Sequence, residues 1–330
     1  MSSDAGAATR ARTQSLNDVR AVIPDSCYDR SAVRASFALA QATVLYLVPV
    51  IGLALTDRWW ALLLLWPLAG LGVAGLFVLG HDASHGALVD SRRANRLIAQ
   101  VCMAPSVHAE AAWDLGHNRI HHGYTTRQGF DFVWHPATVD EYQALTRLGR
   151  LRHRLEWSCF GSGAYFLRVV WWQKMWRFSA PGKRHDAIVR DKLTVGSAVL
   201  VAVAMSVVVG ALTGGWTSAL WLPVKLFVVP FLLFIQIIGW TVYVHHVAPD
   251  IRWWTRRDWT QFKGQMESTT VVRMPAVVNR LWFHNIFVHV PHHVDARIPF
   301  HQLPRAARHI FASYPETVRT SRWSMRGYLH

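Results

Sequence analysis

The chain has 330 residues, of which 52% are hydrophobic and 17 are tryptophan, and its mean hydropathy is +0.14. A composition this apolar is unusual for a soluble domain and predicts a membrane protein. The formal net charge of +15 raises the question of nucleic acid, but the sequence carries no RNA-binding signature, so we predict no nucleic-acid partner. The three cysteines are far apart and odd in number, which excludes a disulfide framework and a CxxC site.

The apolar residues form two pairs of long runs behind a polar N-terminus. Residues 1–17 are predicted to be a disordered tail without a cleaved signal peptide. Residues 36–55 and 59–79 are each long enough to cross a hydrocarbon core of about 30 Å, and only TDR separates them. Residues 194–213 and 219–244 form a second pair, joined by GGWTS. We therefore predict four transmembrane helices in two hairpins, because four such runs in one soluble core would be unusual.

The polar residues lie in two segments, 81–193 and 245–330, outside these runs. The second half of the first segment is rich in arginine and lysine, whereas the hairpin turns are nearly uncharged, so the positive-inside rule places both termini and both segments in the cytoplasm. The net charge then reflects topology and contact with membrane lipid headgroups. We predict that residues 18–330 form one all-α integral membrane domain with a helical cytosolic cap. Residues 93–107 are too short to span and are expected at the interface or in a re-entrant segment.

Histidines cluster where the apolar runs end. Eight of the 18 histidines fall in three short motifs, GHDASH, HNRIHH and HVPHH. These motifs carry His81 and His85, then His117, His121 and His122, then His289, His292 and His293. If the segments are helical, an i, i+4 spacing puts His81 and His85 on one face, and likewise His117 and His121. One such pair is more often a surface feature than a metal site, but three clusters on the same side of a membrane favour metal binding.

The number and type of these side chains indicate which metal they bind. Eight neutral imidazoles exceed what one ion can use, so the sequence predicts two metal ions. Structural zinc prefers four ligands, often thiolates, and catalytic zinc takes three ligands plus water, so neither pattern fits. An open, nitrogen-rich site for two irons that activate dioxygen fits better. Carboxylate-bridged di-iron bundles use a Glu-x-x-His pair, which this sequence lacks.

The motifs also carry a family resemblance. GHDASH, HNRIHHGYT and HVPHH, in this order and separated by a transmembrane hairpin, resemble the three histidine boxes of the membrane fatty acid desaturase and hydroxylase superfamily. VIPDSCYDRSAVRASF resembles the IPxxCxxRS stretch of acyl-lipid delta-12 and omega-3 type desaturases, and FHNIFVHVPHHVDARIPFHQLPRA resembles their C-terminal segment. The resemblance covers about residues 20–310 and implies iron ligation by the eight box histidines.

A ninth ligand is implied near the end of the fourth span. There VYVHHVAPDI offers His245 and His246, and the distance to Pro249 favours His246, although the commoner family pattern has glutamine where His245 stands. Further residues are candidates for orienting the ligands, with helix capping or water contact as the alternative. These candidates are Asp82, Asn118, Asp131, His245, His284 and Asn285. Histidines outside the boxes, such as His108, are expected at the surface. Cap tryptophans such as Trp113 and Trp134 could line a substrate channel, although interfacial anchoring is expected for most of them.

The resemblance implies an oxygen-dependent desaturase that takes two hydrogens from an acyl chain and leaves a carbon–carbon double bond. An unactivated methylene has no acidic proton, so two Fe ions with O2 would supply the oxidising power and the protein would supply position. An apolar, bent tunnel is expected for a fatty acyl substrate carried on lipid, acyl carrier protein or coenzyme A. Alternatives are an acyl hydroxylase or acetylenase on the same scaffold, a membrane zinc hydrolase, and a metal transporter, whose ligands would lie midway along the spans.

Two electrons per turnover must come from outside the chain, because the sequence has no flavin fingerprint, cysteine set for an iron–sulfur cluster, or haem segment. Ferredoxin is the expected donor, since its usual acidity suits a basic cytosolic face. The excess of arginine over lysine and the style of the motifs favour a bacterial cytoplasmic membrane, with the active site on the cytosolic side.

Overall fold

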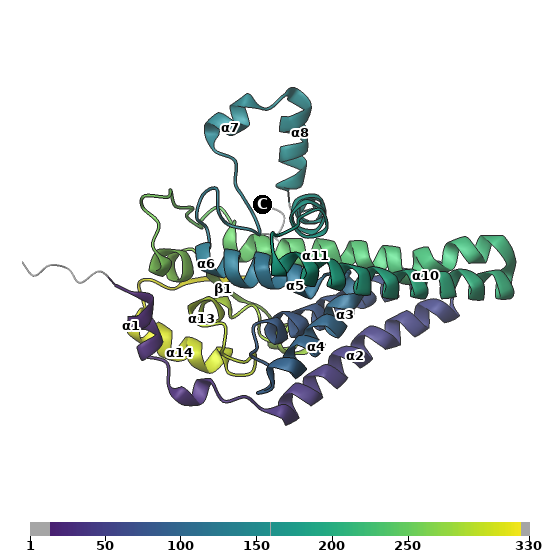
Figure 1. Cartoon of the computed structure of the whole chain (residues 1–330), viewed down its shortest axis with the longest axis horizontal. Coiled ribbons are helices and arrows are strands. Elements are labelled where there is room, and N and C mark those ends of the chain that lie inside the picture. The colour runs from purple at the N-terminus through teal and green to yellow at the C-terminus, as the bar shows by residue number, and fades with distance from the viewer. Residues whose placement is uncertain (1–13, 159, 325–330) are drawn as a thin grey trace, which may run out of the picture.

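The computed structural model describes residues 14–158 and 160–324, which are mostly helical (Figure 1). The helix α1 (Leu16–Ala21) begins after Ser15, whose side chain forms a reciprocal capping box with Asp18. A helix therefore starts two residues before the end of the predicted tail, and residues 1–13 of that tail lie outside the described residues. The short η1 (Asp25–Cys27) follows α1 and leads to the first long helix.

Three apolar helical segments in the described part of the chain are long enough to cross a membrane. They contain α2 (Ala32–Leu55), α3 (Trp59–Ser84), and a third run made of α10 (Lys183–Pro223), η5 (Val224–Val228) and α11 (Val229–His246). Their long stretches extend toward one end of the molecule, and the shorter elements gather at the other end (Figure 1). The predicted spans 36–55 and 59–79 thus fall on α2 and α3, and the predicted spans 194–213 and 219–244 both fall in the third run.

The third run reverses direction within α10. Gly214 and Gly215 leave helical geometry, and Gly215 has a positive φ of 71° that glycine tolerates. A Cβ added to Gly210 would lie 2.4 Å from the carbonyl oxygen of Ser218, so the chain folds back on itself at this point.

The central helix is α3, which packs against α2, α4 and α11. Glycines allow this close packing, since a Cβ on Gly72 would lie 2.6 Å from the Cα of Tyr46 on α2, and one on Gly70 would lie 2.8 Å from Leu233 on α11. The turn between α2 and α3 is tied to η5 by an ion pair of 2.7 Å between Asp57 and buried Lys225. The C-terminal half of α3 is buried, so it carries its last residues into the interior of the cap.

The cap between α3 and α10 consists of short helical elements. They are α4 (Arg92–Met103), η2 (Ala104–Ser106), α5 (Glu110–Trp113), η3 (Asp114–His121), α6 (His122–Tyr124), α7 (Val139–Ala144), α8 (Arg147–Glu156), α9 (Ser162–Tyr165) and η4 (Phe166–Trp176). The amphipathic α4 leaves Leu97 and Val101 more than 60% exposed on one side. These apolar side chains suit the expected position of this segment at a membrane interface.

The C-terminal part of the cap contains the only strands among the described residues. Its elements are η6 (Lys263–Glu267), β1 (Thr270–Arg273), α12 (Ala276–Leu281), α13 (His289–Val294), α14 (Leu303–Ser313) and β2 (Arg319–Arg322). The two strands pair in parallel, with Thr270 opposite Arg319. The all-α prediction is therefore wrong in this detail, because the β-branched run TVV of β1 packs as a buried strand.

The N-terminal segment joins the cap as a third contributor. Leu16, Val19 and Cys27 share a buried core with side chains of α13 and α14. Arg20 donates to the carbonyl oxygen of Val294 at 3.0 Å, and the hydroxyl of Tyr28 donates to the Asp295 carboxylate at 3.3 Å. The cap is thus built from three segments, where the sequence predicted two, because α1 and η1 bury apolar side chains that a free tail would expose.

Candidate metal centre

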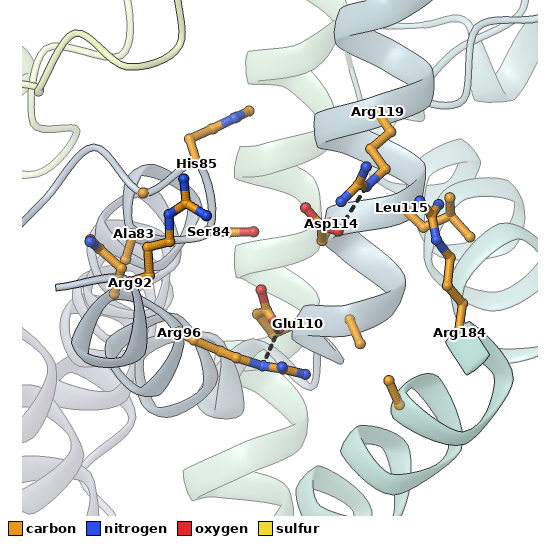
Figure 2. A pocket seen from close by; sticks show the side chains of 14 residues that line it. Ala83, Ser84, His85, Arg92, Arg96, Glu110, Asp114, Leu115, Arg119 and Arg184 are labelled. Atoms are coloured by element: carbon orange, nitrogen blue, oxygen red, sulfur yellow. Dashed lines mark hydrogen bonds and ion pairs between the residues drawn. The ribbon is translucent and has the colours of Figure 1, made fainter.

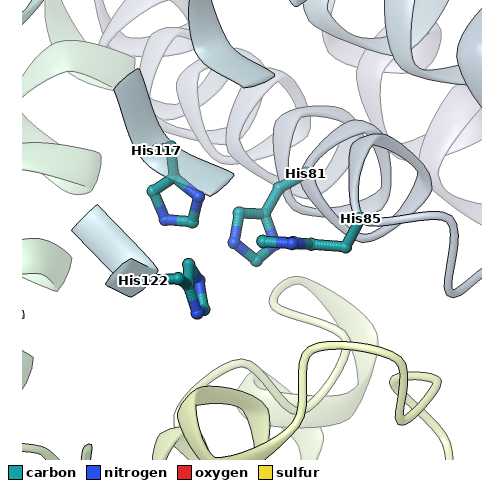
Figure 3. A group of neighbouring side chains, drawn as sticks. All are labelled: His81, His85, His117 and His122. Carbon is teal, nitrogen blue, oxygen red and sulfur yellow. The ribbon is translucent and has the colours of Figure 1, made fainter. Parts of the chain in front are cut away.

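The three histidine motifs meet at the inner ends of the long helices. His81 and His85 stand at the end of α3, while His117 and His122 come from η3 and α6. Potential ligand nitrogens of these four residues all lie within 4.8 Å of one another, and Figure 3 shows their rings converging. We call them the first histidine group. A set of four converging imidazoles at this spacing is suited to holding a metal ion.

A second histidine group lies next to the first. It consists of His121, His246 and His293, whose potential ligand atoms again lie within 4.8 Å of one another. The rings of His122 and His293 are stacked with centroids 4.3 Å apart, so the two groups touch. Two adjacent groups agree with the prediction of two metal ions.

The partition of the second motif differs from the prediction. An α-helical spacing placed His117 and His121 on one face, but η3 is a π-helix, in which residues five apart are aligned. His117 therefore joins His122 in the first group, and His121 turns to the second group. The π-helical turn is the physical reason that one short motif can serve two ions.

The remaining box histidines complete the cluster. The Nε2 atom of His289 lies 3.0 Å from Nε2 of His246 and 3.1 Å from Nε2 of His293, at the second group. The ring of His292 lies beside the first group, with its centroid 4.6 Å from that of His81 and 4.9 Å from that of His85. We call the two groups together with His289 and His292 the histidine cluster.

The two histidines at the end of α11 have different surroundings. His246 belongs to the second histidine group, whereas His245 stacks on His289 with centroids 4.1 Å apart. Both rings are buried. This geometry supports His246 as the ninth ligand and gives His245 a packing role against a neighbouring ligand.

Three of the predicted orienting residues contact box histidines. Asp82 Oδ1 lies 3.0 Å from His81 Nδ1, and Asn118 Oδ1 lies 3.1 Å from His117 Nδ1. Asp131 Oδ1 lies 2.7 Å from His121 Nδ1, and its carboxylate also accepts backbone N–H groups of Thr126 and Val133. An acceptor at Nδ1 fixes the ring and leaves Nε2 facing the cluster, which is the usual outer support of a metal-binding histidine.

The other two candidates lie elsewhere. His284 and Asn285 both adopt positive φ angles, 44° and 64°. The ring of His284 packs near Phe300, and the side chain of Asn285 donates to the Phe300 carbonyl oxygen at 3.2 Å. The contacts of both residues shape the turn before α13. Within the described part of the chain, neither side chain forms a hydrogen bond with a box histidine.

One supporting residue was missed by the sequence analysis. Gln265 Oε1 lies 2.7 Å from His293 Nδ1 and accepts a hydrogen bond from the Thr125 hydroxyl at 3.1 Å. Gln265 lies on η6, far from any histidine motif in sequence, in a polar stretch without a recognisable pattern. Only the packing of η6 against α13 brings it to the cluster.

One expectation about a single residue is wrong, and one pair of alternatives is decided. His108 is not at the surface but fully buried, with its ring against Phe77 and its Nδ1 2.7 Å from the carbonyl oxygen of Ser106. Trp113 is not an interfacial anchor, because it is buried and stacks on His117 with centroids 4.5 Å apart. Both residues precede a box motif closely, so the chain that carries His117 inward carries them with it.

The protonation of the cluster favours metal binding. Burial, and then the neighbouring imidazoles, hold the pKa values of six of these side chains well below the usual value for histidine. These six are His85, His117, His122, His289, His292 and His293. The Nε2 atoms of His85, His122 and His292 are buried without a hydrogen-bond partner. Neutral rings with unpartnered nitrogens that face one another are suited to cations, since unsatisfied buried acceptors are otherwise costly.

An apolar cavity of about 40 Å³ reaches the cluster, and we call it the inner cavity. Beside box histidines it is lined mainly by apolar side chains of α3, α5, α11, the loop after α6 and the turn before α13. These are Phe77, Val78, Trp113, Val133, Ile238, Val242 and Ile286, together with Thr241. The inner cavity therefore presents a small, mainly apolar surface to the histidine cluster.

The fold and the site define a chain with apolar helices long enough to cross a membrane and, at their ends, two buried groups of histidines that could hold metal ions. The chain belongs to the fatty acid desaturase family, whose family model matches residues 58–324. The resemblance carried by the histidine motifs is thereby confirmed. This family consists of enzymes that act on fatty acyl chains.

Individual relatives are similar over most of their length. An sn-1 oleoyl-lipid 12-desaturase of Synechocystis sp. is 27% identical over 87% of this chain and 79% of its own. An omega-6 fatty acid desaturase, chloroplastic, of Glycine max is 24% identical over 94% of this chain and 70% of its own. An sn-1 acyl-lipid omega-3 desaturase (ferredoxin) of Nostoc sp. is 26% identical over 89% of this chain and 80% of its own.

Proposed function

We propose that this protein is an oxygen-dependent di-iron desaturase that introduces a carbon–carbon double bond into a lipid-linked acyl chain. The observation that carries the proposal is the inner cavity, where apolar side chains meet both histidine groups. A cavity of this kind can hold methylene groups of an acyl chain beside the metal centre and exclude water from it. The family membership and the names of the relatives support the same reaction class.

The residues present fit two metal ions. His81, His85, His117, His122 and His292 would hold one iron, and His121, His246, His289 and His293 the other. Bound iron would supply the activation of dioxygen that oxidation of an unactivated methylene requires. Overall, two adjacent methylenes, O2, two electrons and two protons give a double bond and two waters.

The protein's own contribution is to hold the histidine rings in place and to position the acyl chain beside them. The carboxylate of Asp131 and the amides of Asn118 and Gln265 accept at the Nδ1 atoms of His121, His117 and His293, which keeps each Nε2 available. Phe77 and Ile238 pack at the wall of the inner cavity and restrict the rotation of any chain inside it. Regiospecificity then depends on which methylene pair stops beside the cluster.

The topology of the protein follows from the same proposal. We place the reversal at Gly214 and Gly215 on the far side of the bacterial cytoplasmic membrane, so that α10 and α11 make the second of two hairpins and the chain has four spans. The cap, both termini and the histidine cluster would then face the cytosol, within one domain of residues 18–330. An acidic ferredoxin is the proposed electron donor, in line with the name of the Nostoc relative.

The first test is metal content, measured by mass spectrometry on the purified protein. We expect close to two irons per chain, and a clear loss in His121→Ala. The matched control His309→Ala, on α14 outside the cluster, should keep the iron of the native protein. A single zinc, or no metal bound by the native chain, would contradict the di-iron proposal and favour a hydrolase.

The second test is the product. Acyl chains of cells that express the protein should lose two hydrogens at one position, as measured by gas chromatography and mass spectrometry. Gain of a hydroxyl, or conversion of a double bond to a triple bond, would instead assign a hydroxylase or an acetylenase on the same scaffold.

A further inference from the structure

A second hollow lies on the opposite side of the first histidine group from the inner cavity. It encloses about 500 Å³ between the end of α3, α4, α5, the start of η3 and the start of α10, and we call it the arginine basin. Figure 2 shows Arg92 and Arg96 on one side of it and Arg119 and Arg184 on the other, with Glu110 and Asp114 between them. Three separate elements, α4, η3 and α10, thus bring four arginines to one place.

The basin carries excess positive charge. Arg96 pairs with Glu110 at 3.5 Å, and Arg119 pairs with Asp114 at 3.2 Å. Arg92 and Arg184 have no ion-pair partner within the described chain, and both side chains are exposed. Four guanidinium groups therefore face two carboxylates, which leaves a hollow attractive to acidic groups.

Two of these arginines stand where a helix disfavours them. Arg92 is the first residue of α4, and Arg184 is the second residue of α10. The positive end of the helix dipole makes a cation unfavourable at both positions. The dipoles of the two helices also add to the positive potential of the basin. The two arginines therefore lower the stability of their own helices but increase the attraction of the basin for anions.

One wall of the arginine basin contains His85, a proposed metal ligand. His85 lines it and is half-buried, while its Nε2 atom is fully buried and unpartnered. The ring of His85 lies with its centroid 4.8 Å from that of His81 and 4.5 Å from that of His122. A single imidazole therefore separates the basin from the first histidine group.

The basin is separate from the inner cavity. The two hollows share no lining residue, and His81 and His117 line the inner cavity while His85 lines the basin. An acyl chain whose headgroup lay in the basin would have to cross the histidine cluster to reach the inner cavity. The basin is therefore poorly placed for the substrate lipid and well placed for a reagent that acts on the metal centre from outside.

We propose that the arginine basin is the docking surface for the acidic protein that delivers electrons, and that the electrons enter the metal centre through His85. This inference rests on the proposed function, which consumes two electrons per double bond. A one-electron carrier protein would dock twice per turnover, each time losing one electron to the centre and leaving in its oxidised form. Charge complementarity of this kind governs the rate of encounter and the choice of partner.

The test is a charge reversal at the two unpaired arginines, Arg92→Glu/Arg184→Glu. Glutamate is favoured in the first turn of a helix, so α4 and α10 are expected to keep their fold. The matched control, Arg256→Glu/Arg257→Glu, makes the same change of charge at two exposed arginines outside the basin. The probe is a purified acidic plant-type [2Fe–2S] ferredoxin, titrated against each variant in nanodiscs.

At low ionic strength we expect the dissociation constant for ferredoxin to rise at least about tenfold in the basin variant and less than about threefold in the control. The difference should shrink in high salt, because screening weakens the attraction. Iron content should be unchanged. In stopped-flow mixing without oxygen, dithionite should reduce the centre equally fast in both variants, while reduced ferredoxin should be slower only with the basin variant.

An unchanged dissociation constant in the basin variant would overturn the proposal, as would equal losses in the two variants. Loss of co-purifying anionic phospholipid with unchanged ferredoxin binding would overturn it in favour of a lipid headgroup. Loss of iron from the basin variant would overturn it by assigning Arg92 and Arg184 to the support of the centre. Failure of the native protein to bind iron would instead remove the proposed function, an outcome that the metal analysis reports separately.

Discussion

The histidine cluster has two faces of opposite character. On one side, the inner cavity is narrow, enclosed by buried residues and lined by Phe77, Val78 and Ile238. On the other side, the arginine basin is more than ten times larger, open to solvent and lined by four guanidinium groups. Both hollows reach the histidine cluster, yet they share no lining residue.

This contrast teaches how one centre can serve two reagents of different chemistry. An apolar chain needs a dry site that fixes its position, whereas an electron carrier needs a charged surface that favours fast, reversible contact. The histidine cluster lies between the two hollows because His81 and His85 stand one helical turn apart at the end of α3. His81 lines the inner cavity, and His85 lines the basin. The predictions below change one face at a time.

The largest effect is expected from the support of the cluster itself. Asp131→Asn replaces the buried carboxylate that holds His121 at 2.7 Å, and it places an N–H group where Asp131 accepts from Thr126 or Val133. Metal affinity and desaturation should fall roughly 10–100-fold, the usual cost of losing such a partner. Iron content and product yield measure this. Asp140→Asn, at an exposed position on α7, should match the native protein, and equal iron in both variants would contradict the role of Asp131.

The next effect tests the apolar face. Val133→Phe adds bulk to a buried side chain at the wall of a cavity of about 40 Å³. Overpacking costs about 1–3 kcal/mol, so desaturation should fall by roughly tenfold or more while iron stays bound. The same change at Val139, which is 71% exposed on α7, is the control. Unchanged product from Val133→Phe would mean that acyl chains do not occupy this cavity.

A smaller effect is expected from Asn118→Ala. Asn118 accepts at His117 Nδ1 and also donates to the carbonyl and hydroxyl oxygens of Ser84, so it ties η3 to the end of α3. A neutral hydrogen bond contributes about 1 kcal/mol, which corresponds to roughly fivefold in iron affinity. Competition with a chelator measures it. A loss greater than that of Asp131→Asn would reverse the ranking of the two groups.

The smallest effect tests the basin through pH. Burial raises the pKa of Glu110 to about 7, although Arg96 opposes the shift, and Asp191 and Asp114 reinforce it. Because the folded-state pKa lies above that of the unfolded chain, the contribution of Glu110 to stability is present at low pH and is lost as the pH rises through 7. Glu110→Gln should therefore melt like the native protein near pH 5 and at a higher temperature than it above pH 7.5.

Thermal melting of both proteins in detergent between pH 5 and pH 8.5 measures this difference. Two parallel curves would show that Glu110 stays ionised in the basin throughout this range. The basin would then carry less excess positive charge at neutral pH than the raised pKa of Glu110 implies.

The sequence by itself determined which residues could bind metal and which runs are long and apolar enough to span a membrane. Apolar runs of spanning length and imidazoles at i, i+4 spacing are local patterns, and local patterns fix helices and the residues at their ends. For this reason α3, with His81 and His85, could be predicted closely, and three of the orienting residues could be named because they are adjacent to, or shortly follow, a box histidine.

The tertiary structure alone decided which histidines belong to which histidine group and which distant residues contact them. The π-helical turn of η3, which sends His121 to one histidine group and His122 to the other, has no signature in the hydrophobic pattern. Gln265 reaches His293 only through the packing of η6 on α13, and the arginine basin exists only because five elements meet. Contacts between distant segments depend on how helices pack, and the periodicity of a single segment carries no information about its neighbour.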